Sequence, residues 1–68
     1  MSVDIIEFIN GAILGNQQVV VFLLSDEVYK GKAVSLNMNT FQIESLENIY
    51  EINVDEINAI YSVIKGEI

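Results

Sequence analysis

Five short apolar segments follow one another closely along this chain and limit its possible folds more than any other feature. The turns between them are short and polar, as in Ser25-Asp26-Glu27, Asn37-Met38-Asn39 and Leu46-Glu47-Asn48. Segments joined this tightly pair antiparallel, and five of them predict a small, strongly bent barrel. The predicted strands are residues 17–24, 28–36, 40–45, 49–53 and 57–63, with one helical turn between the last two.

A helix is predicted ahead of the strands, over residues 3–14. Apolar residues recur there at three- and four-residue spacing, and Gly15-Asn16 is a good helix stop. The strand at 17–24 is apolar on both faces, so we expect the barrel interior to cover one face and the helix, lying at the open end of the barrel, the other. The apolar face of the helix consists of Ile5, Ile6, Phe8, Ile9, Ala12 and Ile13. The predicted class is therefore mainly β, with an N-terminal helix.

Length and composition favour a single small domain, residues 1–68, that needs reinforcement. A chain of 68 residues buries only about 60% of its unfolded surface. Cysteine and histidine are absent, so disulfides are excluded and we expect neither a metal nor a cofactor. A composition that is 51% hydrophobic is rich for so small a protein. Self-association would bury the excess, and we expect a homo-oligomer.

The charge and hydropathy of the chain limit the kinds of partner that it can bind. Ten acidic residues oppose three lysines and no arginine, giving a net charge of -7, whereas nucleic-acid binders usually carry a basic patch. No apolar run approaches the roughly 18 residues of a membrane span, and no basic N-terminal region indicates a signal peptide, so we expect a cytoplasmic protein. Lacking His, Cys, Arg and a glycine-rich phosphate loop, the chain is predicted not to be an enzyme. Frequent Asn, Ile, Glu and Lys would suit a phage or a low-GC bacterium.

Two segments resemble the motifs of the Sm-like family, the small bent barrels of Sm and Hfq proteins. Gly31 in mid-strand, apolar Val34 and Leu36, and Asn37 at the turn match the first motif, and Ile57-Asn58-Ala59-Ile60 matches the second. The resemblance implies a helix and five bent strands, closed head to tail into a ring that binds RNA. It implies about five to seven subunits, joined through the fourth and fifth strands.

The resemblance also places candidate binding residues in two turns that would line the pore, and these depart from the family pattern. Asn39 and Phe41 stand where Sm proteins hold uridine, and Asn53 stands in place of an arginine. Hfq has a glutamine and an aromatic residue where this chain has Met38 and Asn39, and a Lys-His pair where it has Val54 and Asp55. Base stacking needs a planar group and phosphate binding needs cations. We therefore expect weak RNA binding. The candidate pore residues are Asn37, Met38, Asn39, Asn53 and Asp55.

Each candidate has a plainer interpretation. Asn37 and Asn39 are also good turn formers, and Asn53-Val54-Asp55 can be a connection capped by Asp55. Lys30 and Lys32 share one face of a strand and are candidate phosphate contacts, or ordinary surface charges beside carboxylates. Acidic Glu51, Asp55 and Glu56 could hold a divalent cation, although acidic turns usually face water. The candidate subunit interface is Ile49, Tyr50, Ile52, Ala59, Tyr61 and Val63.

Three functions compete. The first is an Sm-like ring associated with RNA, and the second is an acidic ring-forming scaffold for protein partners. The third is a monomeric peptide-binding barrel of the SH3 kind. The leading helix and the lack of aromatic clusters disfavour the third, the charge favours the second, and the family resemblance favours the first.

Overall fold

A computed structural model describes residues 3–63, which form one helix and five strands. The helix has the predicted range, and no strand end differs from its predicted position by more than one residue. None of the helices within residues 3–63 is long and apolar enough to cross a membrane. The elements are α1 (Val3–Leu14), β1 (Gln18–Leu23), β2 (Val28–Asn37), β3 (Thr40–Ser45), β4 (Asn48–Asn53), the 3-10 turn η1 (Val54–Glu56) and β5 (Ile57–Val63).

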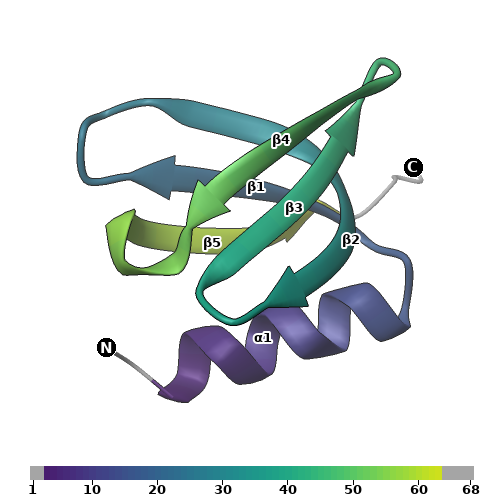
Figure 1. The fold of residues 1–68 in the computed structure, drawn as a ribbon, viewed down its shortest axis with the longest axis horizontal. Coiled ribbons are helices and arrows are strands. Elements are labelled where there is room, and N and C mark those ends of the chain that lie inside the picture. Colours follow the sequence, from purple (N-terminus) through teal and green to yellow (C-terminus); the bar gives the residue numbers. More distant parts are fainter. Residues whose placement is uncertain (1–2, 64–68) are drawn as a thin grey trace.

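The five strands form one antiparallel sheet in the order β4-β3-β2-β1-β5. The sheet bends round on itself, and the long strand β2 curves through it (Figure 1). This confirms the predicted class of an N-terminal helix with a five-stranded bent barrel. Neighbours in the sheet are mostly neighbours in sequence, because short turns allow only antiparallel hairpins. The order leaves β4 and β5 as its two edges.

The helix ends in a motif that directs the chain into β1. Asn16 has a left-handed φ of 52°, and its N–H donates to the carbonyl of Ile13 at 3.1 Å. The N–H of Gln17 reaches the carbonyl of Ala12 at 2.9 Å. These two bonds satisfy carbonyls that the last turn of a helix leaves open. In the predicted helix stop Gly15-Asn16, the residue with the left-handed backbone is therefore Asn16.

Gly31 lies where the backbone of β2 passes close to β3. A Cβ atom built on Gly31 would lie 2.6 Å from the carbonyl oxygen of Glu44 on β3, closer than real Cβ contacts come. Two residues further on, the pairing of β2 with β3 shifts between Ala33 and Ser35. A bulge of this kind increases the local twist and bends the strand. A glycine inside a strand is typical of such a close backbone approach.

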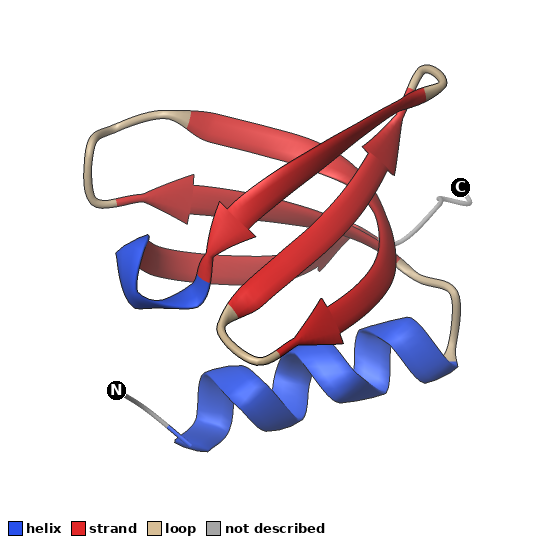
Figure 2. Cartoon of the chain, viewed as in Figure 1, coloured by secondary structure: helices blue, strands red, loops and turns tan. Residues whose placement is uncertain are grey.

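The core lies between the inner face of the sheet and the helix. Phe41, Ile43, Val19, Val21 and Ile9 are completely buried. The helix lies across one end of the barrel (Figure 2), where apolar side chains would otherwise meet water. Four further apolar residues of the helix are partly buried and pack against the core: Ile5, Ile6, Phe8 and Ile13.

One packing expectation was wrong. The outer face of β1 is not covered by the helix, since Phe22 and Leu24 are exposed while Val19 and Val21 are buried. Among the strands, the helix has its most extensive contacts with β2 instead. The reason is the chain reversal at Asn16, which returns β1 into the barrel and leaves α1 across its end.

Candidate functional site

The structure brings the two predicted pore turns together. The side-chain amide of Asn39, in the β2–β3 turn, donates to Asn53 Oδ1 at 3.1 Å and to Asp55 Oδ2 at 2.8 Å. The N–H of Val54 donates to the carbonyl of Asn39 at 2.9 Å. We call Asn39, Asn53 and Asp55 the amide cluster. It is a preorganised polar surface, and its hydrogen bonds also hold the two turns in place.

Asn53 rather than Asp55 caps the 3-10 turn. Asn53 Oδ1 accepts from the N–H of Asp55 at 2.9 Å, and Asn53 has an extended backbone at the cap position. This corrects the cap predicted at Asp55. Because the donors of Asn39 and of Asp55 converge on Asn53 Oδ1, that oxygen is already used twice. All three residues of the amide cluster are exposed.

The other pore candidates differ in accessibility. Met38 is 92% exposed at the tip of the β2–β3 turn, with a left-handed φ of 57°, and Asn37 is exposed beside it. Phe41 is 0% exposed and Val54 is 1% exposed. Neither of these two can stack on a base or touch a phosphate. Of the positions that depart from the family pattern, Phe41 and Val54 therefore offer no accessible side chain, whereas Met38, Asn39, Asn53 and Asp55 remain exposed.

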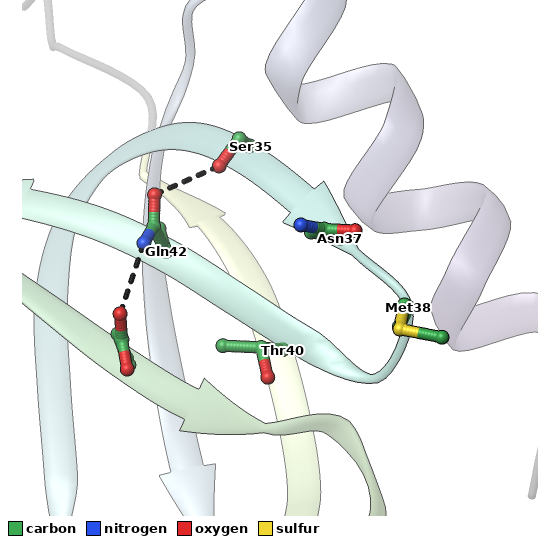
Figure 3. A pocket seen from close by; sticks show the side chains of 6 residues that line it. Ser35, Asn37, Met38, Thr40 and Gln42 are labelled. Atoms are coloured by element: carbon green, nitrogen blue, oxygen red, sulfur yellow. Dashed lines mark hydrogen bonds between the residues drawn. The ribbon is translucent and has the colours of Figure 1, made fainter.

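A shallow pocket of about 310 Å³ opens on the outer face of β2, β3 and β4, next to Met38 (Figure 3). Three of its polar side chains form a ladder across the strands. Ser35 Oγ donates to Gln42 Oε1 at 2.9 Å, and Gln42 Nε2 donates to Glu51 Oε2 at 3.1 Å. The pocket is lined by Ser35, Asn37, Met38, Thr40, Gln42 and Glu51.

Most of this pocket was missed by reasoning from the sequence. Only Asn37 and Met38 were among the candidates, and Glu51 was considered only as a metal ligand. Gln42 lies opposite both Ser35 and Glu51 in the strand register. Setting the register from the turns would align Gln42 with Glu51, because the β3–β4 hairpin is regular. The register of the β2–β3 hairpin, counted from Asn37 and Thr40, aligns Ser35 with Gln42 as well, because the bulge in β2 lies beyond Ser35, towards Ala33.

Lys30 and Lys32 lie away from both the amide cluster and the pocket. Both are exposed on β2, Lys30 opposite Val20 and Lys32 opposite Gln18 and Glu44. They share one face, as expected from their spacing. Within residues 3–63, no three acidic side chains come together in a way that could hold a metal ion, so Glu51, Asp55 and Glu56 are not gathered.

The candidate interface residues lie on the two edges of the sheet, with one correction. Ile49 and Tyr50 on β4 and Tyr61 on β5 are exposed, and Ala59 and Val63 are half-buried. Ile52 is only 3% exposed because its side chain points into the core of its own chain. Its side chain therefore cannot belong to a surface that another subunit touches.

The exposed tyrosines at the edges are supported by aromatic neighbours. Tyr50 lies 5.5 Å from Tyr29 between ring centroids, and Tyr61 packs edge-on against Phe22 at 5.8 Å. Beside Tyr61, a largely apolar groove of about 270 Å³ runs between the first turns of α1 and β5. It is lined by Asp4, Ile5, Phe8, Asn58, Ala59, Ile60 and Tyr61. The β5 edge is thus the centre of a wider apolar surface.

Comparison with known proteins gives one clear result. No family model and no curated protein matches the sequence. Among solved structures, a crystal structure of Hfq, described as a pleiotropic translational regulator, superimposes with a TM-score of 0.76. The match covers 93% of this chain and 98% of the Hfq chain at 15% sequence identity. An agreement this complete at so low an identity shows the architecture, and this chain has the Sm-like fold of Hfq.

Proposed function

We propose that this chain assembles into a homo-oligomeric ring through β4 of one copy and β5 of the next. The observation that carries the proposal is the pair of free edges at opposite ends of one sheet. An exposed edge offers unpaired N–H and C=O groups to another strand, and proteins that stay monomeric usually guard it with lysine or proline. Neither residue occurs in β4 or β5. Head-to-tail pairing of unlike edges closes into a ring of about five to seven copies when the rotation allows it.

Sedimentation of a charged edge variant tests the assembly. Ile49→Lys places a charge on the β4 edge, where the native side chain is 52% exposed, so the fold of the single chain should tolerate it. We expect the wild type to sediment as a ring at micromolar concentration and I49K to shift towards monomer. Leu14→Lys is the matched control, because Leu14 is 86% exposed at the end of α1, away from both edges. A monomeric wild type would contradict the ring.

The ring would associate with RNA at the pore turns. Support comes from the fold shared with Hfq, a translational regulator, and from the amide cluster, whose groups can hydrogen-bond to bases. The cluster contains no cation and includes the Asp55 carboxylate, so phosphate would contribute little to affinity. Binding of single-stranded RNA should therefore be weak and should depend little on salt.

Fluorescence anisotropy with oligo-U and oligo-A at two salt concentrations tests the RNA association. We expect weak binding with a shallow salt dependence, reduced by Asp55→Ala together with Asn39→Ala. Submicromolar binding with a steep salt slope would instead indicate phosphate contacts. Lys30→Ala and Lys32→Ala would then show whether those lysines supply them.

A second candidate function is supported by the charge. A net charge of -7 per copy repels phosphate, and Glu51, Asp55 and Glu56 add exposed acids on and near the β4 edge. An acidic ring that binds protein partners rather than RNA fits these observations. Absence of binding to either oligonucleotide, with the ring intact, would favour this scaffold.

We also propose that the protein is not an enzyme and acts in the cytoplasm. The chain has no histidine, cysteine or arginine to serve as a base, a nucleophile or an anion clamp. In the pocket, the Glu51 carboxylate is hydrogen-bonded to an amide rather than to a second titratable group. Mass spectrometry after incubation with RNA should find the oligonucleotide unchanged.

A further inference from the structure

The ladder in the pocket of Figure 3 has a fixed hydrogen-bond direction. A carboxylate only accepts, so Gln42 must turn its Nε2 donor towards Glu51 and its Oε1 acceptor towards Ser35. Ser35 must then use its single hydroxyl proton on Gln42 Oε1. The two donated protons of the ladder, one on Ser35 Oγ and one on Gln42 Nε2, therefore both point towards Glu51.

The direction determines what the pocket offers to a ligand. Ser35 Oγ donates its only proton to Gln42, so towards a ligand it can act only as a hydrogen-bond acceptor. The Glu51 carboxylate has further acceptor positions beyond the one that Gln42 occupies. Asn37 and Thr40 can each turn an oxygen inward, and no lysine lines the pocket. The site is rich in acceptors and suits a ligand that carries several donors and a positive charge.

From this arrangement we infer that the pocket binds an arginine side chain of a protein partner. A guanidinium is planar, carries five donors and is more weakly hydrated than an ammonium, so it loses less when it enters a half-open polar pocket. Met38 is almost fully exposed at the margin of the pocket and can cover the aliphatic stem or the flat face of the group. The net charge of -7 would steer a basic segment towards the protein.

The arginine cannot come from another copy of this chain, because the sequence contains none. In the proposed ring, the neighbouring copy pairs its β5 with β4. That strand cannot place a lysine in the pocket, because β5 has no basic residue. RNA phosphate would meet Glu51 rather than a cation. The inference goes beyond ring formation and RNA association. The pocket lies within one subunit, so its test does not depend on either.

Methyl NMR measures the binding directly. The chain has two methionines, so the Met38 methyl signal of ¹³C-methyl-labelled protein is readily assigned. The probe is Nα-acetyl-arginine-N-methylamide, titrated at low ionic strength. The citrulline analogue has the same shape without the charge, and the lysine analogue has the charge without the planar fork. We expect saturable shifts of the Met38 methyl with arginine, weaker shifts with lysine and none with citrulline.

Two variants that remove the same charge make the test specific. Glu51→Gln keeps the shape of the side chain and should weaken arginine binding by at least about threefold, in line with a partly exposed ion pair. Glu44→Gln changes an exposed carboxylate on β3 outside the pocket and should leave the affinity unchanged. Equal losses in both variants would reduce the effect to general charge attraction and overturn the inference. Equal binding of arginine and citrulline, or of arginine and lysine, would also overturn it.

Discussion

Gly31 and Gly11 have opposite roles although both lie inside regular elements. Gly31 is buried where the backbone of β2 passes against β3, and a side chain there would meet the Glu44 carbonyl. Gly11 is exposed on α1, with nothing within 4 Å of a Cβ added to it. The first glycine is required by packing. The second only lowers the helix propensity.

Replacing each glycine with alanine should therefore change stability in opposite directions. Gly31→Ala forces a backbone carbonyl aside, and we expect a loss of about 1–3 kcal/mol in the free energy of unfolding. Gly11→Ala should gain about 0.5–1 kcal/mol from helix propensity. Urea unfolding at one protein concentration measures both, and a neutral G31A would show that the β2–β3 contact can relax.

Asn39 joins the two candidate pore turns with one amide. Asn39→Ala removes the hydrogen bonds to Asn53 and Asp55, and we expect the free energy of unfolding to fall by about 0.5–1.5 kcal/mol. Asn37→Ala, in the same turn, is the control, because Asn37 is exposed and has no part in the amide cluster. Equal urea midpoints for N39A and the wild type would mean that these exposed bonds exchange freely with water.

At the scale of elements, α1 closes the barrel end with a narrow part of its apolar face. Ile9 is 0% exposed and Ala12 is buried, while the flanking apolar residues are only partly covered. The stability that the helix contributes should therefore be concentrated at Ile9 rather than spread evenly over its length.

Truncating Ile9 should reduce the stability of the fold much more than truncating an exposed leucine on the same helix. Ile9→Ala should destabilise by about 2–5 kcal/mol, through lost burial and the cavity left behind. Leu14→Ala, at an exposed site, should stay within about 0.5 kcal/mol of the wild type. Thermal and urea unfolding measure both, and comparable losses would place the helix differently against the barrel.

At the scale of the whole molecule, the charge opposes the proposed ring. Each added copy brings a net charge of -7, and subunits of like charge repel one another. The attraction between sheet edges and between apolar residues must exceed this repulsion.

Added salt should therefore strengthen assembly. The Debye length shrinks from about 30 Å at 0.01 M to about 8 Å at 0.15 M, which screens repulsion between copies. We expect the concentration at which half the chains are assembled to fall severalfold over this range, as measured by analytical ultracentrifugation. A ring that dissociates as salt rises would mean that ion pairs hold the copies together.

The sequence by itself determined the order and type of the elements. Strands alternate or are apolar throughout, turns carry Asn, Asp and Ser, and the helix shows one apolar face; each of these is a local property set by periodicity. Phe41 and Ile43 alternate with polar residues along residues 40–45, and both are buried. A glycine inside a strand often marks a bend or a place where another backbone comes near, and Gly31 lies at such a place.

Only the tertiary structure decided which side chains meet. Asn39 joins Asn53 and Asp55 across 14 and 16 residues of sequence, and periodicity carries no information about such pairs. The Ser35–Gln42–Glu51 ladder depends on three strands lying side by side with these residues opposite one another. Ile52 turns inward on a strand that is otherwise exposed. Local patterns set what each segment becomes. The bending of the sheet sets which segments share a surface, because it depends on packing across the whole barrel.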